Sequence, residues 1–524
     1  MKSILPLFAM CALTLGSFAQ DTTLQLDFNN VNAIITSKGH FFNDDVNSMP
    51  GYEIPKGSGL NAIYTSAFWY AAENDTGAIF TCLGGYGMGY DVDRGPYSST
   101  GDYSDPSYDN PYTISICQSE IDAFSLWWEC NNGLAVPGCS DAQQPSNDVL
   151  SSIYNWPGNG NTSLGQSQQL APYFDRNGDG VYDPIGQGDY PIIKGCCATY
   201  MIQNDAGKLH TYSGTDPIGI EMHYLFYQYG ANDLLYNTTF MDVMAINKGE
   251  VDYPNFSQGF YVDGDLGSYG DDYMGSDSLN NMMFFYNADN MDENGYGVDP
   301  PALGIVALET PLTSVVPYSS NNMNSVAGAA YQMNGLKYDS SPWIDPDGNT
   351  TTFAFSGNPN DTTQWSMMSA ANAVPSDNRS LMNTTYNQFN AGDTVKQSYA
   401  IIYSRVGNHL ENAEYLSTLA AEIQAFHDSG DTGCDAGGYL GFDELMHEEI
   451  RVYPNPNKGE FIIDGRDLSI KSLRIVDVAG KEIDYSKHSY GTEVKVDLTE
   501  KSAGVYLVFI TTEYGQHTER IIIE

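Results

Sequence analysis

Most apolar residues of this chain lie in short β-branched or aromatic runs between turn residues, a pattern typical of antiparallel strands. One stretch near residue 410 differs, because its apolar residues recur at the spacing of one helix face, and Asn408 precedes it as a candidate N-cap. The sequence therefore predicts a mainly β protein, a large antiparallel β-rich body closed by one late amphipathic helix. The apolar positions of that helix are Leu410, Ala413, Leu416, Ala420 and Ile423.

A second group of strand-like runs lies after residue 450. Turn signals such as Ala479-Gly480 and Tyr514-Gly515 separate these runs, which predicts a small C-terminal Ig-like β-sandwich. The expected strands are Phe461 to Ile463, Leu473 to Val478, Val494 to Leu498, Val505 to Thr511 and Arg520 to Ile523.

Three motifs in this last unit carry a resemblance. They are "VYPNPNKGEFII" (452–463), "SLRIVDVAGKEI" (472–483) and "VKVDLTEKSAGVYLVFITTEYGQHTERIIIE" (494–524). In order and spacing they resemble the C-terminal sorting domain of type IX (Por) secretion system cargo proteins. The resemblance implies recognition by the type IX secretion machinery, passage across the outer membrane of a Gram-negative bacterium, and then removal of residues 451–524 from a released or surface-attached cargo. An ordinary Ig-like module is the alternative interpretation.

The charge balance supports a boundary at the same place. Residues 451–524 hold ten basic and twelve acidic residues, whereas the rest of the chain holds 12 basic and 54 acidic ones. The Gly- and acid-rich stretch before residue 451 has no sustained periodicity, which is typical of a linker. The expected parts are a body over 20–435, a linker over 436–450 with a cut before Arg451, and the sorting domain over 451–524.

The first residues, "MKSILPLFAMCALTLGSFAQ", place Lys2 before an apolar run that ends in small residues. This is the pattern of a secretory signal peptide over 1–19, cut after Ala19. No other segment has the roughly 20 apolar residues that a transmembrane helix needs. The body motifs "LDFNNVNAII" (26–35) and "FAFSGNP" (353–359) resemble large secreted proteins that carry the same sorting domain, which implies a β-rich architecture and no particular activity.

The net charge of −44 limits the classes of partner that the exported protein is expected to bind. Nucleic acids and anionic membranes require clustered cations, so neither is an expected partner. An acidic exterior instead favours cation binding.

Seven cysteines remain once the signal segment is removed, which allows at most three disulfides in an oxidising compartment. Adjacent Cys196 and Cys197 are expected to bond to two different partners. The absence of a C-x-x-C pair argues against a zinc site. The other five are Cys82, Cys117, Cys130, Cys139 and Cys434.

The segment "FDRNGDGVYDP" (174–184) places oxygen-bearing residues at alternate positions around a glycine turn. This is the spacing of a calcium loop, because calcium takes six to eight oxygen ligands from side chains and carbonyls. No helical pattern flanks it, and Gly186 stands where an EF-hand has glutamate, so a shorter extracellular loop is expected; an Asx-turn loop facing solvent is the alternative. The predicted ligands are Asp175, Asn177, Asp179, Val181, Asp183 and Asp189.

A second acidic group lies among glycines over 263–277, where turns could gather carboxylates around another cation. Its spacing is undefined, so an exposed acidic loop is the alternative, and "DPDGN" (345–349) is expected to be a plain turn. The acids of the group are Asp263, Asp265, Asp271, Asp272 and Asp277.

Established catalytic motifs such as H-E-x-x-H and G-x-S-x-G do not occur. A glycosidase needs only two carboxylates about 5 to 10 Å apart, so a secreted hydrolase acting on polysaccharide stays a candidate. A possible catalytic group is His210, Asp216, Glu221 and His223, although histidines on strands are more often structural.

Aromatic residues could offer stacking faces for sugar rings, but they also fill sandwich cores, which is the expected role of any single tryptophan. The sequence thus favours a calcium-stabilised extracellular binding or structural protein, adhesin-like, whose ligand is a glycan or another surface polymer. The tryptophans are Trp69, Trp127, Trp128, Trp156, Trp343 and Trp365.

Overall fold

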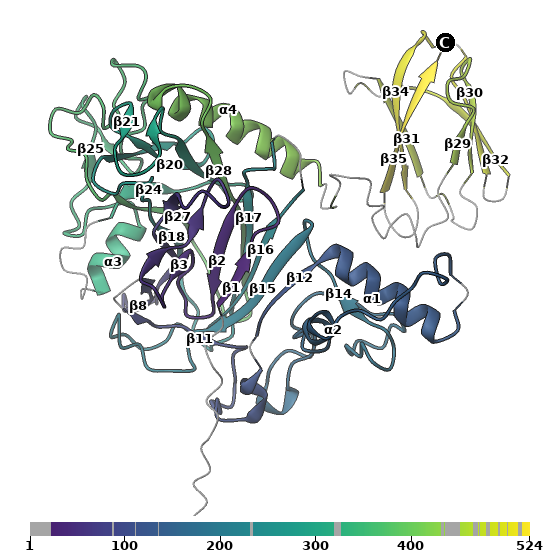
Figure 1. The fold of residues 1–524 in the computed structure, drawn as a ribbon, viewed down its shortest axis with the longest axis horizontal. Coiled ribbons are helices and arrows are strands. Elements are labelled where there is room, and N and C mark those ends of the chain that lie inside the picture. The colour runs from purple at the N-terminus through teal and green to yellow at the C-terminus, as the bar shows by residue number, and fades with distance from the viewer. Residues whose placement is uncertain are drawn as a thin grey trace, which may run out of the picture. The chain divides into compact units, whose positions relative to one another are not determined.

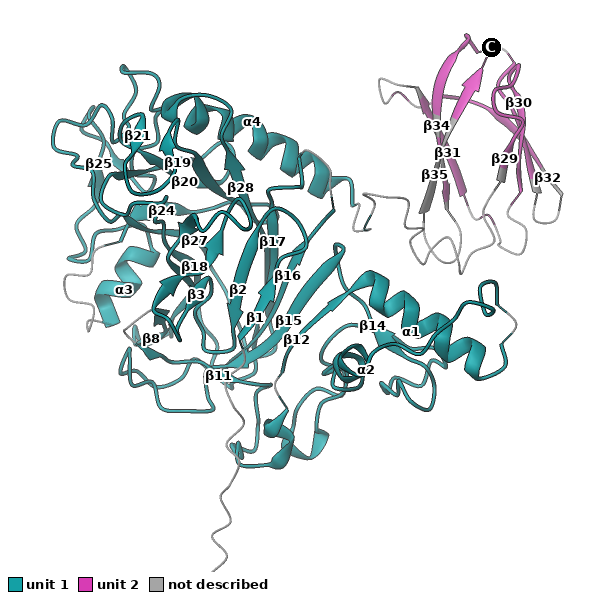
Figure 2. Ribbon diagram, in the orientation of Figure 1, with its two compact units in different colours: residues 1–437 teal, residues 438–524 magenta. Residues whose placement is uncertain are grey.

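The computed structural model divides the chain into two compact units, Met1–Gly437 and Gly438–Glu524 (Figure 2). The predicted signal peptide over 1–19 and the predicted linker over 436–450 lie outside the described residues. The structure describes 23–434 and 451–523, except 86–88, 111, 135, 231–233, 319–325, 431–433, 465–469, 471, 478–480, 482, 491–492, 500 and 512–515.

The first unit, called the body below, contains a nine-stranded antiparallel sheet in the order β11-β15-β16-β17-β28-β23-β20-β19, with β12 also paired to β15. Nearly all residues of β15, β16, β20 and β23 are buried, so these strands are covered on both faces of the sheet. The strands are β11 (Asp93–Arg94), β12 (Thr113–Cys117), β15 (Cys197–Asn204), β16 (Ile220–Gln228), β17 (Thr239–Asn247), β19 (Asp272–Asp277), β20 (Met282–Asn287), β23 (Ala302–Ala307) and β28 (Thr394–Ser404).

A second antiparallel sheet has the order β24-β27-β18-β7-β8. Its strands are β7 (Thr65–Glu73), β8 (Ile79–Cys82), β18 (Asn255–Asp263), β24 (Ser314–Pro317) and β27 (Arg379–Tyr386). A small sheet joins β1 (Thr23–Leu26), β2 (Asn32–Thr36), β5 (Tyr52–Glu53) and β6 (Asn61–Ile63), and two-stranded pairs join β3 (Asn43–Asp44) to β4 (Met49–Pro50), β9 (Gly84–Gly85) to β10 (Gly89–Tyr90), β13 (Tyr173–Phe174) to β14 (Tyr190–Pro191), β21 (Met291–Asp292) to β22 (Gly297–Val298) and β25 (Trp343–Ile344) to β26 (Thr350–Thr351).

Aromatic side chains hold the two large sheets together. Phe68 of β7 stacks on Phe260 of its own sheet, with ring centroids 4.5 Å apart, and on Tyr224 of the nine-stranded sheet at 5.5 Å. The hydroxyls of Tyr70 and Tyr224, both buried, lie 3.2 Å apart. Such aromatic contacts add to area burial, so the many aromatic residues of this sequence stabilise the sandwich core.

The predicted late helix is confirmed as α4 (His409–Asp428), which packs on β20, β23 and β28 (Figure 1). The Asn408 side chain accepts from the N–H groups of Leu410 and Glu411, and the Glu411 carboxylate accepts from the N–H of Asn408, a capping box. The prediction of mainly β structure is also confirmed, but the described residues contain further helices that were not predicted. These are α1 (Gln118–Asn131), α2 (Asn147–Tyr154), α3 (Val326–Met333) and the short 3₁₀ helices η1 (Pro106–Asp109) and η2 (Thr162–Leu164).

The second unit has two antiparallel sheets, β29-β30-β33-β32 and β31-β34-β35, packed around one apolar core that includes Phe461, Val496 and Val508. All five expected strands are present, and β29 and β32 are additional. The strands are β29 (Arg451–Tyr453), β30 (Glu460–Asp464), β31 (Ser472–Asp477), β32 (Ser486–Tyr490), β33 (Glu493–Asp497), β34 (Gly504–Thr511) and β35 (Gln516–Ile523).

Three disulfides cross-link the body: Cys117–Cys197, Cys130–Cys139 and Cys196–Cys434. This confirms that Cys196 and Cys197 take different partners. Among the described cysteines, the one outside these disulfides, Cys82, is buried.

Candidate ligand and cation sites

The predicted calcium loop connects β13 to β14, which pair antiparallel. Phe174 and Tyr190 stack at its base with ring centroids 4.7 Å apart. Residues 175–189 therefore form one hairpin loop, and Asp175 and Asp189 lie at its two ends.

Buried Asp189 closes the loop at its base. Its carboxylate accepts from the N–H of Arg176 at 2.9 Å and from that of Asp183 at 2.8 Å. Asp175 likewise accepts from the N–H groups of Gly178 and Gly180, at 2.8 and 2.7 Å. Both glycines have positive φ angles of +72° and +76°, which non-glycine residues rarely adopt.

The other predicted ligands lie further out. Asn177, Asp179 and Val181 are exposed, and Asp179 accepts from the Val181 N–H at 2.8 Å. Asp183 accepts from the Gly186 N–H. The candidate metal-ligand atoms are all oxygens, which fits calcium better than a softer metal such as zinc. In this loop, all of which lies within the described residues, no three of the aspartates bring carboxylate oxygens within 4.8 Å of one another. The calcium assignment therefore stays a prediction.

Arg176 attaches the loop to α1. Its guanidinium pairs with Glu129 at 2.6 Å, donates to Ser125 at 3.1 Å and lies 5.2 Å from the ring of Trp128. Sequence reasoning missed this residue, because its partners are about 50 positions away in the sequence. The contact orients the loop on the helix whose end is cross-linked by Cys130–Cys139.

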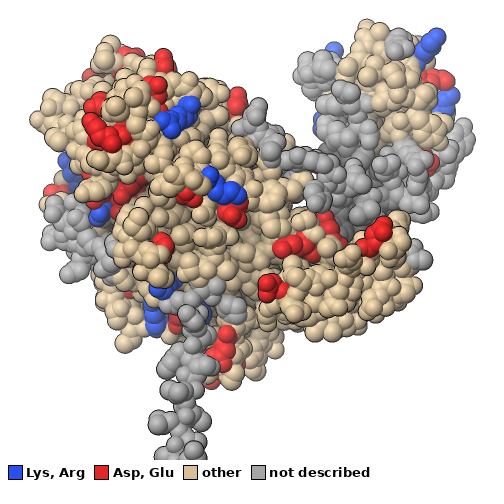
Figure 3. Space-filling view, viewed as in Figure 1, with Lys and Arg blue, Asp and Glu red and all other residues tan. Residues whose placement is uncertain are grey.

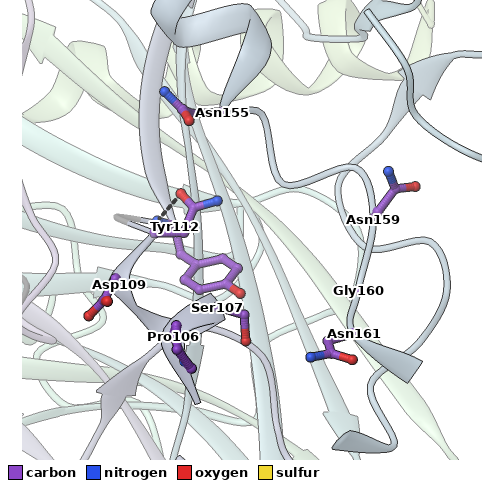
Figure 4. Close-up of a pocket in the computed structure, with 9 residues that line it drawn as sticks. Pro106, Ser107, Asp109, Tyr112, Asn155, Asn159, Gly160 and Asn161 are labelled. Atoms are coloured by element: carbon purple, nitrogen blue, oxygen red, sulfur yellow. Dashed lines mark hydrogen bonds between the residues drawn. The ribbon is translucent and has the colours of Figure 1, made fainter. Parts of the chain in front are cut away.

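A polar pocket of about 590 Å³ lies beside the loop. Residues from 106–110 form one side and residues from 155–161 form the other, with the Tyr112 ring between them (Figure 4). Asn159 joins pocket and loop, because its side chain accepts from the Tyr182 N–H and donates to the Tyr182 carbonyl, both at 2.8 Å. The lining residues are Pro106, Ser107, Asp109, Asn110, Tyr112, Asn155, Asn159, Gly160 and Asn161.

Tyr112 is the unusual residue of this pocket. Its φ of +49° is uncommon for a bulky residue, and such backbone conformations cluster at binding and catalytic sites. This pocket could not be predicted from the sequence, because asparagines are ordinary turn residues and nothing in their spacing predicts that the two segments meet.

The second acidic group is divided by the fold. Asp263 and Asp265 lie close to Asp377, which sequence reasoning did not associate with them. Asp272 is buried and accepts from the Leu266 N–H, and Asp277 accepts from Ser417 of α4 and from turn residues. Burial is the main cause of the raised pKa of Asp271.

Of the possible catalytic group, the structure brings His223 and Glu221 into contact. His223 contacts Glu221 at 3.0 Å and the Tyr200 hydroxyl at 2.7 Å inside the sheet, whereas Asp216 is exposed. Both ring nitrogens of His210 face backbone carbonyl oxygens, Thr81 at 2.9 Å and Asp205 at 2.6 Å. Both histidines of this group are therefore buried and make structural contacts.

The tryptophans are largely packed, as expected. Trp69 and Trp156 are buried, and the others are partly buried. Acidic side chains lie in several separate patches on the face shown in Figure 3. None of the described helices is long and apolar enough to cross a membrane.

Residues 451–524 match the family model described as a secretion system C-terminal sorting domain. No curated protein sequence matches the chain. Among solved structures, a polysaccharide lyase is similar at 9% identity and a TM-score of 0.20, over 58% of this chain and 34% of that one. A lysyl oxidase from Pichia pastoris is similar at 9% identity and a TM-score of 0.29, over 73% of this chain and 52% of that one.

This chain thus spans about a third of the lyase and about half of the oxidase. The sorting-domain match confirms the resemblance seen in the three C-terminal motifs. The matched residues form the β-sandwich of the second unit. The chain is a cargo protein of the type IX secretion system, exported through the outer membrane to the cell surface or the extracellular space.

Proposed function

We propose that the body is an extracellular binding protein of the adhesin type, which takes a glycan or similar hydroxyl-rich surface polymer in the pocket around Tyr112. The observation that carries this proposal is the composition of the pocket: four asparagine amides, one tyrosine ring and one serine in about 590 Å³. An amide side chain both donates and accepts hydrogen bonds, which suits sugar hydroxyls, and binding pockets commonly combine a few such groups with an aromatic face.

The rival function is hydrolysis of polysaccharide. A glycosidase requires two carboxyl groups about 5 to 10 Å apart. Of the described residues that line the pocket, Asp109 alone carries a carboxyl group. This composition favours binding without cleavage.

The loop over 175–189 has a supporting role in the proposal. Calcium held by Asp175, Asn177, Asp179, Val181, Asp183 and Asp189 would stiffen the loop, and Asn159 would transmit that order to the pocket through Tyr182. The ion is therefore proposed as a structural cofactor.

Binding assays with cell-surface polysaccharides and with a glycan array test the proposal. The double variant Asp109→Ala/Asn155→Ala removes two exposed lining side chains and should weaken binding at least tenfold with little change in melting temperature. Asp347→Ala, in the exposed turn 345–349, is the matched control and should bind like the parent. Release of shortened sugar products would support the hydrolase instead, and equal binding by all three proteins would refute the pocket assignment.

The calcium part has its own test. Millimolar calcium should raise the melting temperature of the full chain relative to chelator, because an ion that binds only the native state stabilises it by mass action. Asp179→Ala should reduce that rise. If the rise is the same in Asp179→Ala, the loop does not hold the ion.

A further inference from the structure

Adjacent strands β18 and β27 bring three acids to one end of the five-stranded sheet. Asp263 is the last residue of β18 and pairs in register with Arg379, the first residue of β27. Asp265 lies two residues after Asp263, and Asp377 lies two residues before Arg379. The antiparallel register thus places all three carboxylates at the same end of the sheet, although Asp265 and Asp377 are 112 positions apart in the sequence.

These carboxylates are close enough to share one ion. One carboxylate oxygen from each of Asp263, Asp265 and Asp377 lies within 4.8 Å of the other two. Calcium binds oxygens at 2.3 to 2.6 Å, so two ligands on opposite sides of one ion are at most about 5 Å apart.

The acidic and basic side chains at this end of the sheet do not balance in charge. Arg379 is a cation in contact with the group: its Nε lies 3.0 Å from Asp263 and its Nη2 lies 2.7 Å from Asp377. Three carboxylates and one guanidinium leave two negative charges, which is the charge of one divalent cation.

The buried carboxylate of Asp263 is the one in this group that most needs a compensating positive charge. It is only 5% exposed, and its Oδ1 is buried without a hydrogen-bond partner, which is costly for a carboxylate. Among the described residues, Asp263 Oδ1 therefore lacks a hydrogen-bond donor, and a cation bound there would compensate its charge.

We infer that Asp263, Asp265 and Asp377 form a second calcium site, separate from the loop over 175–189. Arg379 holds two of the acids in place and leaves Asp263 Oδ1 for the ion. The Asp377 side chain is 39% exposed, so the ion can enter from solvent on that side. The all-oxygen donor set selects a hard cation, and the bound ion would fix the segment after β18 to the segment before β27.

Calcium titration of the full chain by calorimetry tests this inference. The titration uses an Asp179→Ala background, so that the loop does not contribute, and compares it with Asp263→Asn and Asp377→Asn in the same background. Each added substitution should weaken calcium affinity at least tenfold or remove one equivalent of binding. Asp347→Asn, at the exposed turn, should leave the titration unchanged.

Unchanged stoichiometry and affinity in both added variants would overturn the inference. The alternative is that a proton, not calcium, is shared between Asp263 and Asp377. Asp263→Asn mimics a neutral Asp263, so in that case it should melt at the same or a higher temperature than its parent. No protein of the series should then respond to calcium. If Asp263→Asn does not fold, Asp377→Asn carries the test, because Asp377 lies on the exposed side. Failure here leaves the loop and pocket proposals unaffected, since those depend on Asp179 and Asn155.

Discussion

Cys196 and Cys434 are joined by a disulfide across 238 residues of sequence, while the neighbouring Cys197 is joined to Cys117. Cys434 follows α4, and Cys196 directly precedes β15 of the large sheet. The bond therefore fastens the C-terminal end of the body to the sheet, just before the segment in which the predicted cut would separate the sorting domain.

The double variant Cys196→Ser/Cys434→Ser should unfold more easily than the parent, by about 2 to 4 kcal/mol, because removal of a long-range cross-link frees the unfolded chain. Denaturant unfolding measures the loss. Cys130→Ser/Cys139→Ser opens a loop of only nine residues and should cost less. A larger loss in this control would contradict the explanation.

Deletion of residues 451–524 should leave the protein in the periplasm, because these residues carry the sorting domain. Cell fractionation followed by immunoblotting checks the location. The body and the sorting domain have separate apolar cores, so the retained protein should keep the melting temperature of the body. Appearance of the truncated protein in the medium at the parent level would show that the domain is dispensable for export.

Asp189→Ala should lower stability by about 1 to 3 kcal/mol even in chelator, because the N–H groups of Arg176 and Asp183 lose a charged acceptor in a buried place. Thermal unfolding measures it. Asp179→Ala in chelator is the control and should have little effect, since Asp179 is exposed. Equal effects of the two variants would mean that Asp189 does not hold the loop.

Trp69→Phe should lower the melting temperature and leave glycan binding unchanged. The indole Nε1 donates to the Gly84 carbonyl at 2.6 Å, and the ring stacks on Tyr261 at 5.1 Å, both in the interior. The expected loss is about 1 to 3 kcal/mol, for the acceptor left unpaired. A selective loss of glycan binding without destabilisation would make Trp69 a ligand contact after all.

Asp45→Asn should destabilise the protein above about pH 4 and progressively less towards pH 2. Burial alone would raise the pKa of Asp45, but hydrogen bonds from His40 and Lys38 outweigh it and lower the pKa from 3.8 to about 2. A lowered carboxyl pKa contributes stability above the unfolded value that is lost as the pH falls through the folded value. Melting temperatures over pH 2 to 6 measure this, and Asp75→Asn, in an exposed turn, should show no such trend.

Local patterns predicted much of this protein. The apolar spacing after Asn408 predicted α4 and its cap, the β-branched runs after residue 450 predicted the second sandwich, and the three C-terminal motifs predicted the export route. These features succeed from sequence because capping, strand alternation and turn chemistry depend on residues close together in the chain. The extra helix α1 was missed because its buried face consists of few positions, Ile121, Phe124 and Ser125.

Only the tertiary structure decided which polar residues meet. Asp377 joins Asp263 through the register of β18 and β27, Asn159 and Tyr112 face one pocket from separate loops, and Cys434 reaches Cys196 across most of the body. The sequence alone determined the residue types and their local turns. Long-range proximity depends instead on how two sheets pair and pack, which is set by the summed burial of many apolar side chains rather than by any local motif.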